Sequence, residues 1–229
     1  MTMPQRHLGA LRVGAIGLGC MPMSWGYTAS AADPIEVRAT LHRAVELGVT
    51  LFDTSDVYGP FTNERLIHEH IVRDGLRERV VIATKGGLLP MNATTYGFDG
   101  SPAHMRRACD ASLERLGVDV IDLYQYHRVD PKVPLEETWG ALSELVTAGK
   151  VRYLGLSEAT IDQIRRAHAI HPVTSVQSEL SIWTTDHIDN GVIEYCRAHD
   201  IGFLPFSPLG RGYLTGALDH GVIDAQDFR

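Results

Sequence analysis

Four side chains of different chemistry lie at or just after short strand-like runs of this sequence. Asp53 comes directly after such a run, Lys85 follows Val81–Thr84 and His127 follows Ile121–Tyr126, while Tyr58 lies in the segment after Asp53. A lysine at the end of a buried strand needs an acid nearby, and Asp53 on the neighbouring strand can reach it. A tyrosine beside that lysine is expected to have a lowered pKa, which suits a phenol that donates a proton near neutral pH. Together these residues predict acid–base chemistry.

Each of these side chains also has an ordinary structural explanation. Asp53 could cap a turn, Tyr58 could pack a loop against the rim of the fold, and Lys85 could extend along apolar surface to reach water. His127 is one of eleven histidines. The functional interpretation is favoured because an acid, a cation, a phenol and an imidazole converge from successive strand ends.

The elements that would position these residues form a repeating pattern. Seven apolar runs of strand length begin on average about 31 residues apart, which suits repeated strand–helix–strand units. Because the runs are apolar at successive positions, they are typical of parallel strands buried on both faces. The predicted strands are Ala15–Leu18, Thr50–Phe52, Val80–Ala83, Val120–Leu123, Tyr153–Leu156, Ser175–Gln177 and Ile201–Phe206.

Helix signals lie between the predicted strands. Asp33 stands before a proline as a predicted N-cap, and Gly48 ends that helix. Ser101 and Gly117 bound a second predicted helix in the same way. Thr160 predicts a third, because a glutamine three residues later completes a capping box.

Two architectures fit this alternation, a doubly wound open sheet and a (β/α)8 barrel. The first would need Gly14–Gly19 as a dinucleotide-binding fingerprint, but its glycine spacing is wrong and no helix start follows. We therefore expect residues 1–229 to form one α/β domain, a (β/α)8 barrel whose floor is closed by a hairpin within Arg6–Val13. Chemistry in such barrels gathers at the carboxyl ends of the strands, where the four side chains are expected.

The overall composition excludes other classes of function. With 28 acidic and 21 basic side chains the formal charge is -7, which disfavours nucleic acid and anionic membranes as partners. No apolar run is as long as a membrane span, and the N-terminus lacks the apolar core of a signal peptide, so a cytoplasmic location is expected. The three cysteines lie far apart and are expected to be buried thiols.

The sequence resembles the aldo-keto reductase superfamily, NADPH-dependent carbonyl reductases on a (β/α)8 barrel. The matching stretches follow the family order along nearly the whole chain. They are Phe52–Gly59, Asn63–Glu64, Ile82–Lys85, Ile121–His127, Lys150–Ser157 and Phe206–Gly212. The resemblance implies an oxidoreductase with Asp53, Tyr58, Lys85 and His127 as its catalytic tetrad.

The resemblance also implies a role for each residue. Hydride would pass from NADPH to the carbonyl carbon of an aldehyde or ketone while Tyr58 protonates the oxygen, with Lys85 and Asp53 favouring the phenolate and His127 orienting the carbonyl. Contacts to the cofactor are implied for Ser157, Glu158, Gln177, Phe206, Ser207, Pro208, Leu209, Gly210 and Arg211. Glu158 departs from the commonest family pattern, which has asparagine there, and a carboxylate cannot donate to the carboxamide oxygen.

Two further groups of residues have less specific signals. Trp25 and Tyr27, after the first strand, are candidates for the wall of a substrate pocket for an apolar or aromatic carbonyl compound, and packing at the rim is an equally good explanation. Met91, Tyr96 and Phe98, in the long loop after Lys85, share both interpretations. No metal site is expected, because His68 and His70 would face apart on a solvated helix over Asn63–Arg73.

A rival function comes from a different class of protein. Relatives on the same fold bind NADPH tightly and act as regulatory or redox-sensing subunits of potassium channels, with little turnover. The intact tetrad favours an enzyme, and turnover on a carbonyl compound distinguishes the two. The oligomeric state and the physiological carbonyl substrate are not predicted by any motif.

The length of 229 residues gives the last expectation. Eight strand–helix units need about 250 residues, and only seven strands can be placed. The family grips the adenosine 2′-phosphate with basic residues after the eighth strand, and nothing after Arg211 matches them. We therefore expect a C-terminally incomplete barrel, and NADPH rather than NADH rests on the resemblance alone.

Overall fold

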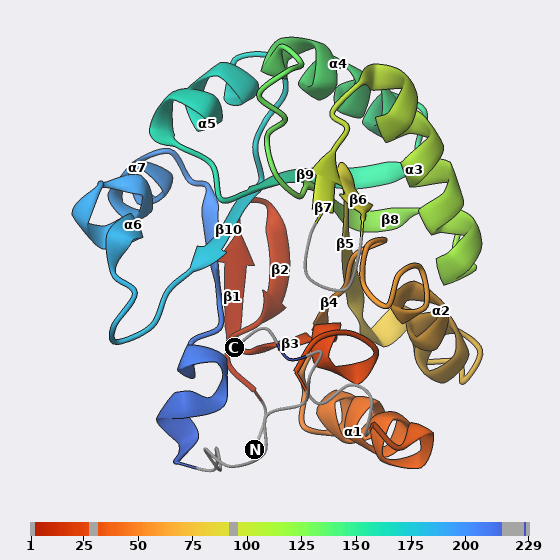
Figure 1. The fold of residues 1–229 in the computed structure, drawn as a ribbon. Helices are drawn as coiled ribbons and strands as arrows, with labels where there is room; N and C mark the ends of the chain where they lie inside the picture. Colours follow the sequence, from red (N-terminus) through yellow and green to blue (C-terminus); the bar gives the residue numbers. More distant parts are fainter. Residues whose placement is uncertain (1–2, 28–31, 92–95, 217–226, 228–229) are drawn as a thin grey trace.

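The computed structural model describes residues 3–27, 32–91, 96–216 and 227. At its centre seven parallel strands form one sheet that curves inside a ring of helices (Figure 1). The strands are β3 (Gly17–Gly19), β4 (Leu51–Asp53), β5 (Val81–Gly86), β8 (Ile121–Tyr126), β9 (Val151–Ser157), β10 (Ser175–Glu179) and β11 (Gly202–Phe206). Strands adjacent in the sheet follow one another along the chain. This order confirms the barrel class and shows that the doubly wound alternative is wrong, because the order of a doubly wound sheet reverses at a switch point.

Helices connect the strands on the outer side of the sheet. They are α1 (Pro34–Glu46), α2 (Asn63–Ile67), α3 (Pro102–Leu116), α4 (Leu135–Thr147), α5 (Ile161–His168), α6 (Asp186–Asp189) and α7 (Val192–Ala198). Short 3-10 turns are η1 (Met21–Met23), η4 (Arg77–Arg79) and η5 (Gly210–Thr215), and a π-helical turn, η3 (His68–Val72), continues α2. The prediction that Asn63–Arg73 form a solvent-exposed helix is wrong at its start, because Asn63 and Glu64 are fully buried.

The predicted helix starts are confirmed by their caps. The Asp33 carboxylate accepts the N–H of Ile35. Ser101 caps α3 through its hydroxyl, and Thr160 and Gln163 form the reciprocal capping box of α5. Each cap satisfies backbone amides that a helix start leaves without a partner, which is why these positions could be recognised in the sequence.

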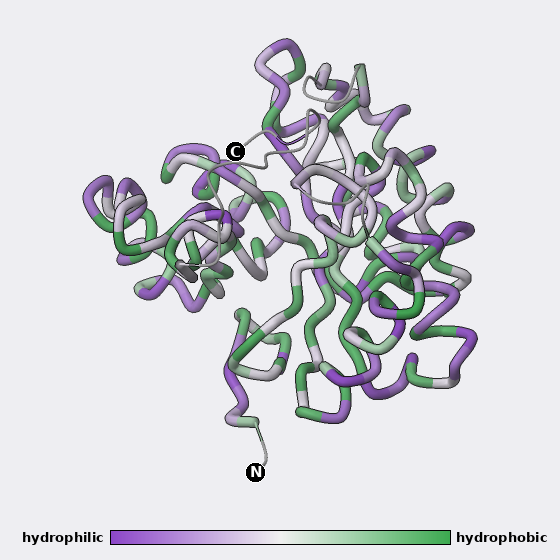
Figure 2. The backbone as a smooth tube through the Cα atoms, turned by 60° about the horizontal axis from the view of Figure 1, so that its bottom comes forward, coloured by the Kyte–Doolittle hydropathy of each residue, from purple (hydrophilic) through white to green (hydrophobic). Residues whose placement is uncertain are grey.

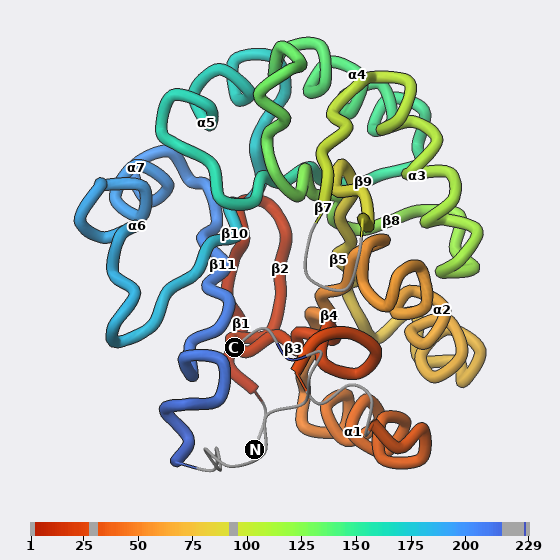
Figure 3. Tube along the Cα trace, viewed as in Figure 1, coloured from red at the N-terminus to blue at the C-terminus, as the bar shows by residue number. Residues whose placement is uncertain are grey.

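A hairpin fills the amino-terminal end of the barrel. It consists of β1 (Gln5–Leu8) and β2 (Leu11–Gly14), as expected, and β1 also contacts β11 (Figure 3). Its apolar side chains form a small core with residues from the first halves of three central strands. That cluster is Leu8, Leu11, Val13, Leu51, Ala83 and Leu123. The floor of the barrel is therefore closed by apolar packing, and polar chemistry is left to the other end.

The strand period of two explains how the polar end is built. Within one strand, residues two apart point to the same face. Leu51 and Asp53 on β4 are such a pair, and Leu123 and Gln125 on β8 are another. Because the first member of each pair packs on the hairpin, the second lies one layer nearer the carboxyl end.

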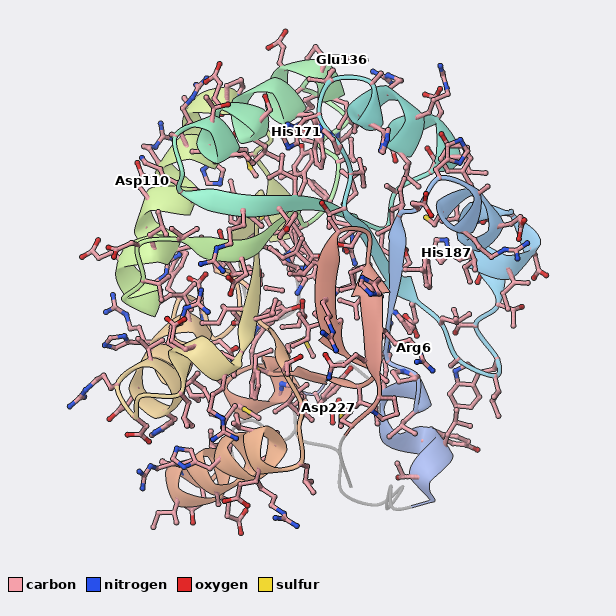
Figure 4. All side chains as sticks on the ribbon, turned by 180° about the vertical axis from the view of Figure 1, so that it is seen from behind. Arg6, Asp110, Glu136, His171, His187 and Asp227 are labelled. Atoms are coloured by element: carbon pink, nitrogen blue, oxygen red, sulfur yellow. The ribbon has the colours of Figure 1, made fainter. Side chains whose placement is uncertain are left out.

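The larger core lies between the sheet and the helices. Figure 2 shows hydrophobic segments concentrated along the central strands and hydrophilic ones mainly on outer loops and helices. The three cysteines are buried free thiols within this core, as predicted. On the outside, exposed ion pairs join neighbouring helices, such as Glu136 of α4 with Arg166 of α5 (Figure 4).

Two features of the described residues bear on the remaining expectations. The segment after β5, expected as a loop, contains a second hairpin of β6 (Leu88–Pro90) and β7 (Tyr96–Phe98). None of the helices in the described ranges has the combined length and apolar character that a membrane crossing needs. The prediction about the eighth strand–helix unit concerns residues after 216, which, Asp227 apart, lie outside the described residues.

Candidate active site

Asp53 and Lys85 form a close ion pair at the carboxyl ends of β4 and β5. Lys85 Nζ lies 2.6 Å from Asp53 Oδ2 and also donates to the carbonyl oxygen of Thr54 at 2.8 Å. The lysine side chain is 1% exposed and the aspartate side chain 15%. Burial lowers the pKa of Lys85, but the negative charge of Asp53 and the neighbouring Tyr58 more than offset it, so the pKa is raised. The lysine is therefore charged at neutral pH, and the predicted pairing is confirmed.

Tyr58 reaches back to this pair from the loop after β4. Its hydroxyl lies 3.4 Å from Lys85 Nζ, and that nitrogen is 5.1 Å from the centre of the phenol ring. The expectation of a lowered pKa is wrong here. Burial raises the pKa of Tyr58 by more than the charge of Lys85 lowers it, because the phenol is almost fully enclosed. At neutral pH Tyr58 thus carries its proton.

His127 completes the predicted group from the residue after β8. Its ring stands at 82° to the ring of Tyr58 with the centroids 5.9 Å apart. Burial, followed by the charges of Lys85 and Arg128, holds the pKa of His127 well below its usual range. The imidazole is therefore neutral, and its Nδ1 lies 3.1 Å from the hydroxyl of Ser55.

A second carboxylate oxygen of Asp53 is held by two glutamines. Gln177 Nε2 on β10 and Gln125 Nε2 on β8 donate to Asp53 Oδ1 at 2.9 and 3.2 Å. Gln177 is thus brought to the predicted site. Sequence reasoning missed Gln125. The available signal was a polar amide inside a run predicted to be a buried strand, and all six residues of β8 are indeed buried.

Arg128, the residue after His127, was also missed. Its Nη1 donates to the hydroxyl of Ser157 at 2.8 Å and to the backbone carbonyl oxygen of His127 at 2.6 Å. Ser157 ends β9 and is 1% exposed. One guanidinium therefore fixes the spacing between the predicted catalytic histidine and a predicted cofactor residue. An arginine directly after a strand-end histidine was the available signal.

The loop between Asp53 and α2 is anchored by buried polar groups. Asn63 accepts from Thr54 at 2.6 Å and donates to the carbonyl oxygen of Cys20 at 2.9 Å. Glu64 accepts from Thr84 at 2.6 Å and from Arg115 at 2.6 Å. Because every donor of this set is matched to an acceptor, the loop that carries Tyr58 is held in one position.

Glu158 follows β9 and contacts protein groups from two other elements. Its backbone is left-handed, with φ of 52°, and its carboxylate accepts the N–H of Glu179 at 2.9 Å. The other oxygen lies 3.1 Å from Nε2 of His187 on α6, a helix that Figure 4 places at the side of the barrel. In this arrangement both carboxylate oxygens serve to join β9, β10 and α6.

The end of β11 and the loop after it carry the other predicted cofactor residues. These are Phe206, Ser207, Pro208, Leu209, Gly210 and Arg211. Three of them are left-handed, Ser207, Gly210 and Arg211, and a Cβ on Gly210 would lie 2.3 Å from the ring of Trp183. The loop therefore needs glycine at 210.

Arg211 is the charged side chain of this loop. Arg211 and Gly212 are successive left-handed residues, with φ of 55° and 96°, and the N–H of Gly212 donates to the carbonyl oxygen of Leu209 at 3.1 Å. The guanidinium of Arg211 adds a charge, which Glu179 Oε2 neutralises at 2.8 Å. That hydrogen bond to Glu179 raises the pKa of Arg211, so the cation is permanent.

Trp25 lies against the predicted proton donor. Its ring centre is 5.5 Å from that of Tyr58 and 5.9 Å from that of Tyr96 on β7. Tyr27 has a left-handed backbone with φ of 44°, and it contributes electrostatically to the environment of Arg211. Both candidate wall residues thus lie at the end of the barrel that carries the polar cluster.

The His68–His70 stretch has structural contacts. Nδ1 of His68 lies 3.0 Å from the carbonyl oxygen of Leu116 at the end of α3. Across the described parts of the chain, no three histidine, cysteine or acidic side chains lie together as metal ligands would.

Comparisons with known proteins show the family. The Aldo/keto reductase family matches residues 15–224. A probable aldo-keto reductase 1 of Glycine max is 46% identical over 215 residues, which cover 93% of this chain and 60% of that relative. This chain therefore spans 60% of the length of that curated relative.

Solved structures give the same result. The glycerol dehydrogenase of Gluconobacter oxydans has a TM-score of 0.86 at 27% identity, covering 98% of this chain and 69% of its own. An aldo-keto reductase of Bacillus halodurans, in its holo form, has a TM-score of 0.82 at 29% identity, covering 96% and 72%. With the family match over most of the sequence and the same fold in these structures, the chain belongs to the aldo/keto reductase family.

Proposed function

We propose that this protein reduces aldehydes or ketones to alcohols with NADPH, and that Tyr58 is the proton donor. One observation carries the proposal: a protonated phenol lies 3.4 Å from a buried ammonium that is itself paired with a carboxylate. The nicotinamide ring, when bound, supplies the hydride for the carbonyl carbon. The protein's part is to supply the proton and to stabilise the charge that develops on oxygen.

Tyr58 would give its proton to the oxygen as negative charge builds up there. Its raised pKa keeps the proton on the phenol until that charge appears. The phenolate left behind is stabilised by the positive charge of Lys85, because opposite charges at this distance interact strongly in a buried site. Asp53 keeps Lys85 charged and fixed in position.

His127 would orient the carbonyl group. A neutral imidazole can donate one hydrogen bond, and Nδ1 is already engaged with Ser55. The other ring nitrogen, Nε2, is therefore the atom that would contact the substrate oxygen. The rings of His127 and Tyr58 lie 5.9 Å apart between centroids, and we propose that both donors contact the same oxygen atom.

The proposed cofactor contacts lie along β9, β10 and β11. Ser157 and Gln177 would bind the carboxamide, and the loop after β11 would bind the pyrophosphate through backbone amides and Arg211. Phe206 would stack on the nicotinamide. Glu158 would act mainly by holding Glu179 and His187, since both of its oxygens are engaged. The choice of NADPH over NADH follows the family resemblance.

The proposed substrate is a small carbonyl compound with an apolar or aromatic body. Trp25 supports this, because its indole packs beside Tyr58. Tyr27 is proposed as a second wall residue.

Steady-state oxidation of NADPH with a panel of aldehydes tests the proposal. We expect turnover with apolar and aromatic aldehydes, and slower turnover when NADH replaces NADPH. Binding of NADPH is measured in parallel by quenching of tryptophan fluorescence. Tight binding without turnover on any carbonyl compound would instead support a regulatory subunit.

A further inference from the structure

Ser55 is a buried hydroxyl with more acceptors than it has protons. It is fully buried, and its Oγ lies 3.1 Å from Nδ1 of His127, 3.2 Å from Oδ1 of Asp56 and 3.3 Å from the carbonyl oxygen of Lys85. A hydroxyl donates one hydrogen bond and accepts two. The direction of the bond between Ser55 and His127 is therefore set by what the other two neighbours require.

The carbonyl oxygen of Lys85 already accepts the backbone N–H of Asp56 at 3.2 Å, so it does not need the proton of Ser55. Two arrangements of protons among Asp56, Ser55 and His127 then follow. If Asp56 is ionised, Ser55 donates to an acceptor oxygen and accepts from His127 Nδ1–H, which leaves Nε2 of the neutral ring without a proton. If Asp56 is protonated, it can donate to Ser55, and Ser55 then donates to Nδ1, which places the proton of the ring on Nε2. The two arrangements differ in the tautomer of His127.

Asp56 is placed where its protonation can change. It is 3% exposed. The titratable groups that act on it are Glu64 from α2, Arg115 from α3 and Tyr124 from β8, and its carboxylate accepts hydrogen bonds from Ser55 and from the backbone of Val57. Burial, and then the charge of Glu64, raise the pKa of Asp56 to about 7, against the smaller opposing effect of Arg115.

We infer that Asp56 and Ser55 are positioning residues that set the tautomer of His127. With Asp56 protonated, Nε2–H is a donor and can bind a carbonyl oxygen. With Asp56 ionised, Nε2 is an acceptor, which suits the hydroxyl of an alcohol. The consequence for catalysis rests on the proposed carbonyl reduction, whereas the tautomer itself does not.

Nitrogen-15 NMR of the imidazole rings tests the tautomer directly. The His127 signals are identified by their loss in His127→Gln. In the wild-type protein we expect the proton of His127 to move from Nε2 to Nδ1 as the pH rises through about 7. Asp56→Asn has an amide that donates permanently, so Nε2–H should persist at high pH. Ser55→Ala should remove the pH dependence.

Kinetics test the consequence separately. Above pH 7, kcat/KM of the wild-type protein for NADPH-dependent reduction of benzaldehyde should fall about tenfold per pH unit, and that of Asp56→Asn should change less than about twofold between pH 6 and 8. If the tautomer of His127 is the same at pH 6 and 8, or changes alike in wild type and Asp56→Asn, the inference is wrong. If the tautomer changes as expected but no carbonyl is reduced, the proposed function fails and the inference stands.

Discussion

The two halves of the strand-end region are held together differently. At β4, β5 and β8 the ion pair of Asp53 and Lys85 is buried and is completed by hydrogen bonds from neutral amides. Between the end of β10 and η5 the pair of Glu179 and Arg211 is partly exposed, with side chains 20% and 41% accessible. Separating the first pair would cost much free energy, because a charge would be left buried without its counter-ion. Separating the second pair would cost little free energy, because water screens both charges.

This difference matches what each half is proposed to do. A proton donor and its supporting charges must keep one geometry, since catalysis by electrostatic stabilisation depends on groups that need not rearrange. A cofactor loop has to bind and release an anion. An arginine whose ion pair is weakened by water, such as Arg211 with Glu179, can exchange its carboxylate partner for a phosphate more readily than a buried arginine. The left-handed residues Ser207 and Arg211 belong to this second half.

The largest expected effect is on the buried pair. Asp53→Ala leaves the charge of Lys85 buried without an anionic partner, which should lower the free energy of unfolding by about 3–5 kcal/mol. Urea denaturation of the purified protein measures this. A loss below about 1 kcal/mol would mean that the pair behaves like a surface pair.

A pH series should separate Asp56 from the exposed carboxylates. Its pKa is raised from 3.8 to about 7, so between these values the folded protein binds more protons than the unfolded chain. The contribution of Asp56 to the free energy of unfolding therefore falls as the pH rises from about 4 to about 7, by up to about 4 kcal/mol. The difference between wild type and Asp56→Asn in urea denaturation, followed against pH, isolates this contribution. A constant difference across the range would contradict it.

A smaller effect is expected at the aromatic wall. Trp25→Ala removes the indole that packs on Tyr58. We expect kcat/KM for large aromatic aldehydes to fall about tenfold relative to that for small aldehydes, because a pocket contact is lost only for the larger substrate. If kcat/KM fell equally for large and small aldehydes, Trp25 would be a packing residue at the rim and not part of the wall of the substrate pocket.

The smallest expected effect is on the exposed pair. Glu179→Ala should change the free energy of unfolding by less than about 1 kcal/mol, since Arg211 is screened by water. The same change should tighten NADPH binding, because the guanidinium no longer has an internal partner. Glu179→Gln, which keeps the size and an acceptor, is the matched control. Weaker binding in Glu179→Ala would show that Glu179 holds Arg211 in its binding position.

The sequence predicted those parts that depend on local rules. The strands, the first hairpin and the caps at Asp33, Ser101 and Thr160 follow from apolar runs and from unsatisfied amides at helix starts. The pairing of Asp53 with Lys85 could also be predicted, because a strand-end lysine in a parallel sheet needs an acid on an adjacent strand.

The remaining parts depend on three-dimensional surroundings. The pKa of Tyr58 was predicted in the wrong direction because the loop encloses the phenol, and the extent of burial is not a property of the motif. Gln125 and Arg128 were missed because their partners come from other strands. The contacts of Glu158 to the N–H of Glu179 and to His187 were not foreseen, because these partners lie on β10 and α6.

The central claim is that Tyr58 donates the proton in a reaction supported by the buried pair. The most direct test measures kcat for NADPH-dependent reduction of an aromatic aldehyde, together with the Kd for NADPH, in wild type and Tyr58→Phe. Since phenylalanine keeps the ring and removes only the hydroxyl, we predict a loss in kcat of about 100-fold or more with a nearly unchanged Kd. A variant that keeps the wild-type kcat would show that Tyr58 is not the proton donor.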